Sequence, residues 1–442
     1  MKSLWFAVLM ALLCLEGLGR KYIPAVPGVI FYFAKDVVLV FGFMRFRHSA
    51  DIDATWRRLY GGFRFAWIAA FGWTLMEILN PAQDSFILGL VGMRAYWLWW
   101  FSPLLIAGVL ESQRERRHAI YTLSGLAVIV ALMAMYQFVS PPTDDVNLYG
   151  FADGESTRID TALVASTGRA RVASTFSYIT GFTDFAILAP PLLLSLGLGT
   201  EDPPVRGAAL VGALAISAAV PMAGSRGAIV LSLIVLVVIA WSAGLFFTVV
   251  GRRVLIGVIV GVVVGMTAFP DAMQGVQDRF NQSEEETQNR FLEVLQIIPP
   301  VTMATAEYPV FGLGTGMMQN ARAAFHLPDP PYNAESENHR YLIEVGPVGF
   351  SLVWTAKLGL IIVLLKMRKI LKRARRRAAS GVALAYAICT FGGNLTFDHV
   401  YQALYFTGVG FVLAEVMAVQ RARQEESVMA AESQPRLVSA AP

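Results

Sequence analysis

The 442-residue chain has little charge and almost no cysteine. Asp, Glu, Lys and Arg make up 15% of its residues, while 55% are hydrophobic. Soluble globular domains carry roughly 25% charged residues, so the composition excludes that class and indicates a polytopic membrane protein. The two cysteines, Cys14 and Cys389, both lie in apolar runs. This placement argues against a disulfide framework and against a cysteine-based metal site.

The chain also lacks the roughly ten-residue alternating segments of an outer-membrane barrel. Its apolar runs are about 17 to 25 residues long, enough to cross roughly 30 Å of hydrocarbon as helix. The first run has no small-residue cleavage site and meets Arg20 and Lys21, so we interpret it as a retained span. The sequence predicts an all-α membrane protein with about twelve transmembrane helices, near residues 3–19, 25–44, 63–80, 86–110, 119–139, 176–199, 207–222, 227–249, 254–269, 346–365, 379–395 and 400–419.

A basic segment at residues 366–377 sets the predicted orientation. It has eight basic and no acidic residues, and the positive-inside rule therefore places it in the cytoplasm. Alternation then puts both termini inside, together with the basic stretches at 45–64, 114–117 and 252–253. The predicted organisation is spans one to nine over 1–269, a large outer helical loop over 270–345, spans ten to twelve over 346–420, and a cytoplasmic, disordered tail over 421–442.

The fourth run is interrupted by Arg94. A charged residue at mid-membrane costs roughly 2.5 to 3.5 kcal/mol on insertion scales. A span that starts nearer Ala95 would leave Arg94 at the interface. Ionisable residues occur within other spans as well, and such residues are typical of transport pathways. The candidates for such a pathway are Lys35, Asp36, Glu77, Asp184 and Lys357.

Three arginines fall on the predicted outer side, against the general charge bias. They are Arg171, Arg226 and Arg290. We interpret them as ligands for an anionic, membrane-borne substrate, because the planar guanidinium can pair two phosphate oxygens and stays charged next to lipid. The alternative is that they snorkel to the interface or form salt bridges with acidic neighbours, of which the sequence offers Asp160, Glu284 and Glu293.

His339 lies in the outer loop, just before the apolar run at 346–365. An imidazole with an ordinary pKa near 6.5 can take a proton from a sugar hydroxyl at neutral pH, the task of a general base in glycosyl transfer. A structural hydrogen-bonding role is the alternative. A metal site with His326 and either Asp329 or Glu335 lacks a recognised ligand spacing, so no metal or cofactor is expected.

Two other features of the loop bear on structure. Glu284 and its neighbours open a segment, 283–306, whose composition predicts an amphipathic helix on the outer leaflet; Pro299 and Pro300 should break or bend it. The glycines of 308–316 allow either a tight turn or a close approach of backbone amides to a ligand, and we favour the turn.

Several of these segments, in this order, resemble the O-antigen ligase and polymerase superfamily. They are Arg171-Val-Ala-Ser-Thr-Phe176, Gly224-Ser-Arg-Gly-Ala228, Arg290, Phe311-Gly-Leu-Gly314, and Asn338-His339 followed by Glu344-Val-Gly-Pro-Val-Gly349. The resemblance covers about residues 165–350. One departure is Arg340 after the histidine, where many relatives read asparagine.

The resemblance implies a metal-independent glycosyltransferase of C-type architecture in the bacterial inner membrane, with its active site facing the periplasm. Arg226 and Arg290 would hold the diphosphate of an undecaprenyl diphosphate-linked glycan, and His339 would activate the acceptor hydroxyl. Arg171 fits the family's arginine before the sixth span less specifically. The implied partners are this donor, a glycan or lipid A core acceptor, membrane lipid and a chain-length regulator, with no nucleic acid.

The leading hypothesis is a polymerase of exopolysaccharide or O-antigen repeat units. The first alternative is a ligase that moves finished glycan onto lipid A core or protein, which the same three residues would serve. The second is a transporter or flippase of lipid-linked glycan, which the ionisable residues within spans would serve, although no inverted repeat is visible.

Overall fold

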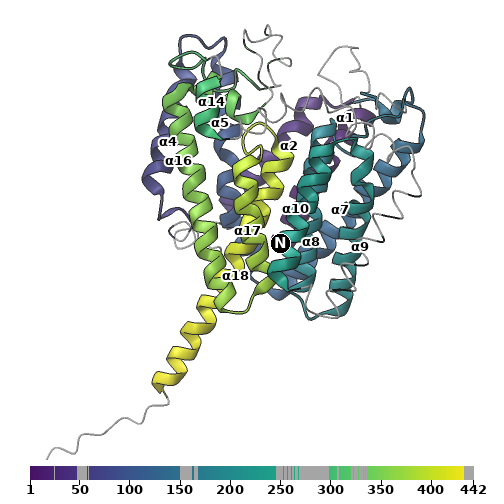
Figure 1. The fold of residues 1–442 in the computed structure, drawn as a ribbon, viewed down its shortest axis with the longest axis vertical. Coiled ribbons are helices and arrows are strands. Elements are labelled where there is room, and N and C mark those ends of the chain that lie inside the picture. Colours follow the sequence, from purple (N-terminus) through teal and green to yellow (C-terminus); the bar gives the residue numbers. More distant parts are fainter. Residues whose placement is uncertain are drawn as a thin grey trace, which may run out of the picture.

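Helices form the fold of the computed structural model (Figure 1), which describes residues 1–23, 25–46, 57, 59–149, 162–163, 168–244, 252, 256, 260, 263, 267, 298–305, 308–319, 322, 327, 332, 334 and 336–432. Within these ranges no strand occurs, and Leu163 and Ala170 form only an isolated antiparallel bridge. The predicted all-α class is confirmed.

The described helices follow the apolar runs of the sequence closely. They are α1 (Lys2–Tyr22), α2 (Gly28–Phe46), α4 (Arg64–Met76), α5 (Phe86–Trp97), α6 (Ser102–Val109), α7 (Gln113–Val139), α8 (Ile179–Leu198), α9 (Pro203–Ala219), α10 (Arg226–Ala243), α14 (Pro299–Thr305), α16 (Glu337–Arg373), α17 (Arg377–Gly392) and α18 (His399–Glu432).

Among the described helices, 6 are long and apolar enough to cross a membrane: α1, α7, α8, α9 with its following turn, α16 and α18. A seventh apolar stretch, Gly227–Ala243 in α10, is shorter. A multi-pass membrane protein is therefore supported. The total of twelve spans and the orientation of the termini stay predictions.

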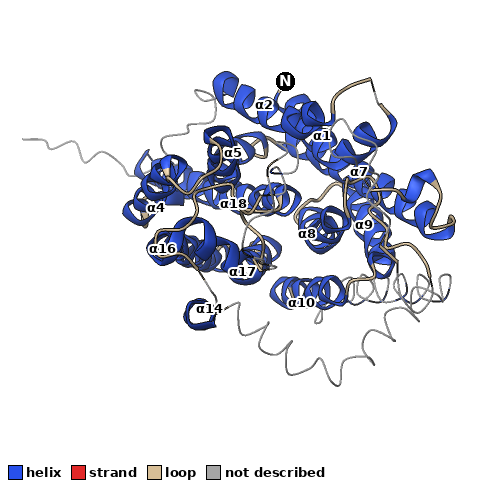
Figure 2. Ribbon diagram, turned by 90° about the horizontal axis from the view of Figure 1, so that it is seen from above, coloured by secondary structure: helices blue, strands red, loops and turns tan. Residues whose placement is uncertain are grey.

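α18 lies at the centre of the bundle. Seen from above, it sits between α5, α8 and α17 (Figure 2). Of its apolar window 94% is buried inside the protein, against 39% for α1. Close packing against α17 requires Gly408, because a Cβ there would lie 2.2 Å from the ring of Tyr386. Small residues let membrane helices approach in this way.

The fourth predicted span is not one helix. It consists of α5, a 3₁₀ turn at Leu98–Phe101 and the short α6. Arg94 stays inside α5 rather than at a helix start near Ala95, and its Nε donates to Asp36 Oδ2 of α2 at 2.6 Å. The carboxylate supplies the counter-charge that insertion of an isolated arginine lacks, which explains why the helix need not begin after it.

The other ionisable residues within the predicted spans also have partners. Lys35 Nζ lies 2.6 Å from Glu16 Oε2, and Lys357 Nζ lies 2.6 Å from Glu337 Oε2. Glu77 accepts a hydrogen bond from Asn80 at 2.6 Å. Asp184 of α8 is hydrogen-bonded to Asp398, just before α18. Lys35 with Glu16 and Asp184 with Asp398 each join two segments of the bundle, whereas Lys357 with Glu337 spans the kink within α16.

Two boundaries differ from those predicted. α16 begins at Glu337 and continues through the predicted loop boundary at 345. α18 continues to Glu432, so residues 421–432 of the predicted disordered tail are helical. The physical reason in the second case is the composition of residues 421–432, which is rich in Ala, Glu and Arg. These are good helix formers, and they extend a helix that is already packed in the core.

Removing the carboxylate of Asp36 should destabilise the protein by about 3 to 5 kcal/mol, because Arg94 would stay buried without its counter-charge. The free energy of unfolding in detergent micelles, measured by SDS titration, should fall by this amount in Asp36→Leu. The double variant Asp36→Leu/Arg94→Leu should recover most of it. As a control, Asp202→Asn removes the partner of the exposed Arg117 and should cost no more than about 1 kcal/mol. An equal loss in both single variants would contradict the account.

Candidate functional site

His339 stands in the first turn of α16. Ser336 caps this helix, since its Oγ accepts a hydrogen bond from the backbone N–H of His339 at 3.3 Å. The imidazole is half-buried, and its Nε2 is buried without a hydrogen-bond partner in the described part of the chain. A buried nitrogen in this state is open to a hydrogen bond from a substrate hydroxyl.

The orientation of the histidine depends on a kink in α16. Gly346 has φ 63° and ψ 179°, and Pro347 follows it. The kink frees carbonyl groups that would otherwise bond within the helix. Two of them accept from the turn at 308–316: Ile343 O from Leu313 N at 2.8 Å, and Glu344 O from Gly314 N at 2.9 Å. Trp73 Nε1 of α4 donates to the next carbonyl, that of Val345, at 3.0 Å.

The glycine-rich segment at 308–316 is therefore a turn, as predicted. Two of its backbone amides donate hydrogen bonds to carbonyl groups of α16. Gly312 has φ 76°, and a Cβ there would lie 2.3 Å from Glu344 O. Only glycine fits both the left-handed backbone and this close approach. The turn thus fits against the kink.

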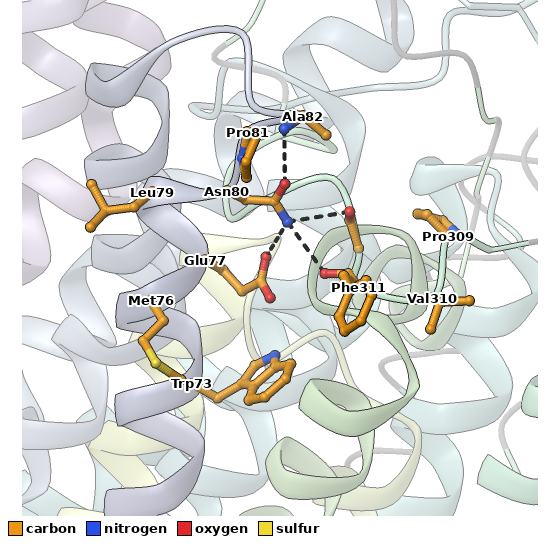
Figure 3. A pocket seen from close by; sticks show the side chains of 11 residues that line it. Trp73, Met76, Glu77, Leu79, Asn80, Pro81, Ala82, Pro309, Val310 and Phe311 are labelled. Atoms are coloured by element: carbon orange, nitrogen blue, oxygen red, sulfur yellow. Dashed lines mark hydrogen bonds between the residues drawn. The ribbon is translucent and has the colours of Figure 1, made fainter.

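Asn80 connects the same turn to the segment that follows α4 through side-chain hydrogen bonds. Its Nδ2 donates to Glu77 Oε2 at 2.6 Å and to the carbonyl oxygens of Phe311 and Gly312 at 3.3 Å (Figure 3). A cavity of about 560 Å³ opens beside it, lined largely by apolar side chains such as those of Trp73, Met76, Leu79, Val310 and Phe311. This cavity is suited to hydrocarbon rather than to a sugar.

The neighbours of His339 have structural roles. Asn338 is buried and accepts from Trp354 Nε1 at 2.9 Å, across the kink. Arg340 donates through Nε to Ala334 O at 3.0 Å, and its guanidinium lies over the ring of Phe397 at 5.4 Å. Arg340, which departs from the family pattern, therefore packs against the segment before α18.

Arg171 and the start of α10 come together. Arg171 is half-buried, and its Nε donates to Ala223 O at 3.5 Å. Gly224 follows in the left-handed region at φ 58°, and Ser225 caps α10 by accepting from Ala228 N at 3.3 Å. Arg226 is the first residue of α10. Within the described residues no carboxylate pairs with Arg171.

The structure brings these two predicted positions to the same end of the bundle as His339. α10 and α16 both begin at the upper end in Figure 1, and α17 packs against both. The fourth predicted residue, Arg290, lies outside the described residues, as do Asp160, Glu284, Glu293, His326, Asp329 and Glu335. Of the predicted helix at 283–306, the described part is α14, which begins at Pro299, where proline fits the first turn.

A cluster of charged and aromatic side chains from α1, α2, α5 and α18 also lies at the end of the bundle that carries His339. The sequence predicts only some of its members. His399, the first residue of α18, packs on Tyr32 with ring centroids 4.6 Å apart. Tyr32 Oη accepts from Arg94 at 3.1 Å, and Arg20 Nη1 of α1 lies 3.6 Å from Glu16. The sequence points to Arg94 and Asp36 but not to His399, whose only signal is the preceding Asp398, the single acidic residue between Glu344 and Glu415.

Comparison with known proteins gives one family match. Residues 211–354 match a family model described as O-antigen ligase. The matched range includes the start of α10, the turn at 308–316 and His339, and it leaves out Arg171. No match was found among curated proteins. The match confirms the resemblance to the O-antigen ligase and polymerase superfamily, and over residues 211–354 the chain is similar to the O-antigen ligase family model.

Proposed function

We propose that the protein is an inner-membrane glycosyltransferase that transfers glycan from an undecaprenyl diphosphate carrier at the periplasmic face, and that it polymerises exopolysaccharide or O-antigen repeat units. The observation that carries the proposal is the state of His339: its Nε2 is buried without a partner in the described residues, on a helical turn fixed by the kink at Gly346.

The diphosphate has a place near Arg171 and the start of α10. Arg171 contacts the backbone three residues before Arg226, and the N-terminal end of a helix attracts anions through its free amides and its dipole. Arg290 adds a third charge in this account. Preorganised cations at the departing diphosphate lower the barrier, with one such donor worth about 3 kcal/mol or more.

The reaction is a direct displacement at the anomeric carbon. The acceptor hydroxyl oxygen forms the new glycosidic bond while the bond to the diphosphate oxygen breaks. The hydroxyl proton passes to Nε2 of His339, and the negative charge leaves on the carrier diphosphate beside the arginines. Attack opposite the leaving group inverts the anomeric centre, and this chemistry requires no metal.

A ligase is the second candidate, favoured by one finding: the matched family is described by ligase activity. Ligase and polymerase share the donor and differ in the acceptor, which is lipid A core or protein for the ligase. The transporter hypothesis is weakened because ionisable residues that suggested it already have partners of opposite charge, as Asp36 has Arg94 and Lys357 has Glu337.

The proposal is tested by incubating purified protein with undecaprenyl diphosphate-linked repeat units from its host and resolving the products by size. A ladder of lengthening lipid-linked glycans is the expected result. Donor that is consumed only when lipid A core is added would establish the ligase instead. Donor that stays intact with every acceptor would sink the assignment as a glycosyltransferase.

His339→Ala should lower the rate of glycan transfer by about 10² to 10⁴, the usual contribution of a positioned general base. The same assay with saturating donor measures it. The matched control is His118→Ala, since His118 lies exposed near the start of α7, and its rate should be unchanged. A His339→Ala protein that inserts into the membrane and retains full activity would remove the base assignment.

Arg171→Ala, Arg226→Ala and Arg290→Ala should each weaken donor binding and lower the transfer rate by roughly 10² to 10³. Arg→Lys at these positions should recover only part, because lysine keeps the charge but loses the planar fork. Binding of a labelled undecaprenyl diphosphate in detergent gives the affinity. Arg423→Ala, an exposed arginine on α18, is the control. Unchanged donor affinity in all three variants would contradict a diphosphate clamp.

A further inference from the structure

A second polar site lies at the opposite end of the bundle from His339. It is a cavity of about 330 Å³ where the last turns of α10 and α16 meet the first turn of α17. α16 has 37 residues, and at 1.5 Å per residue this separates the cavity from His339 by roughly 50 Å. Four basic side chains line it: Arg368, Lys372, Arg375 and Arg377.

The charge of this basic pocket is not balanced within the described residues. None of its four basic side chains forms an ion pair there, and the nearby Glu415 already pairs with Arg116 at 2.6 Å and Arg376 at 3.8 Å. The carboxyl ends of α10 and α16 each offer about half a negative charge. Four positive charges therefore exceed the counter-charge that the helix ends provide.

The first turn of α17 adds to the excess. Arg376 and Arg377 stand at its N-terminal end, where the helix dipole is also positive, and no side chain caps it. Basic residues are unfavourable at this end of a helix, whereas an anion is favourable. Ser380, buried one turn further on, also lines the pocket.

Backbone strain occurs at the same place. Arg375 follows the end of α16 with φ 60°, the left-handed position that glycine usually occupies after a helix. An arginine there costs free energy that glycine would not. Two polar atoms of the pocket, Arg368 Nε and Ser242 Oγ, are buried without hydrogen-bond partners in the described residues.

The pocket opens to an apolar helix face. Trp241 lines it and is 59% exposed, as is typical of tryptophan at the interface between membrane and water. From it an exposed stripe of Val230, Leu233, Ile234 and Val237 runs along α10. A polar, positively charged cavity joined to an apolar stripe matches a molecule with an anionic head and hydrocarbon chains.

We propose that the basic pocket binds the phosphate headgroup of an anionic phospholipid, whose acyl chains lie along the exposed stripe of α10. The positive-inside rule asks only for basic residues on one side of the membrane. It does not require four of them to converge on one cavity with unpartnered polar atoms. Basic pockets between transmembrane helices are known to hold anionic lipid headgroups.

The test is native mass spectrometry of the full chain, titrated with phosphatidylglycerol, with zwitterionic phosphatidylcholine or with inorganic phosphate. Phosphatidylglycerol should bind to saturation, at least tenfold more tightly than phosphatidylcholine. Equal retention of the two lipids would overturn the proposal without any variant. Inorganic phosphate that binds as tightly as phosphatidylglycerol would overturn the lipid assignment.

Arg368→Gln/Lys372→Gln should weaken phosphatidylglycerol binding about 25-fold, at about fivefold for each basic residue, which corresponds to on the order of 1 kcal/mol apiece. The matched control is Lys366→Gln/Lys369→Gln, which removes the same charge from exposed positions of the same segment outside the pocket. Equal weakening in both proteins would show a general surface attraction and contradict a site.

Arg375→Gly separates binding from folding. Glycine relieves the left-handed backbone, so the thermal midpoint of the lipid-free protein should stay the same or rise. Affinity for phosphatidylglycerol should nevertheless fall about fivefold. A stable Arg375→Gly protein with unchanged affinity would contradict the proposal.

Discussion

The kink of α16 at Gly346 is the constraint on which the end of the bundle that carries His339 depends. A continuous helix would keep its carbonyl groups for its own ladder and would direct the first turn elsewhere. The break exposes the carbonyls of Ile343, Glu344 and Val345, and the turn at 308–316 and Trp73 satisfy them. Because those bonds have one geometry, the turn that carries His339 has one orientation relative to the bundle.

Most polar side chains around His339 likewise have structural roles. Asn80 holds the turn, Asn338 joins the two halves of α16 through Trp354, and Arg340 packs over Phe397. A catalytic side chain is precise only when the residues around it are fixed by their own contacts. His339 differs from Asn338 and Arg340 in having a buried ring nitrogen, Nε2, without a hydrogen-bond partner in the described residues.

Composition and apolar periodicity were enough to predict the helical class and the places of most helices, since membrane helices follow length and hydropathy. The turn at 308–316 was also predictable, because several glycines close together have few other uses. For Arg171 and the start of α10, the sequence predicts only that both lie on the same side of the membrane. It does not predict the contact between Arg171 and Ala223, because this contact depends on how the segment before α8 packs on the turn before α10.

Other features depend on tertiary pairing and carry no local signal. The insertion cost of an isolated charge predicts Arg94 at an interface, whereas in the fold its counter-charge comes from Asp36, which lies on another helix. The continuity of α16 through residue 345 was hidden by its proline, which normally marks a helix boundary. The convergence of basic residues around Arg375 appeared in sequence only as a topology signal.

The most direct measurement is a structure of the protein with an undecaprenyl diphosphate-linked oligosaccharide bound, determined by electron cryomicroscopy in a lipid nanodisc. We expect the diphosphate beside Arg171 and the first turn of α10, with the anomeric carbon facing Nε2 of His339 across the space of one acceptor hydroxyl. A diphosphate bound elsewhere, with the imidazole turned away from the sugar, would contradict it.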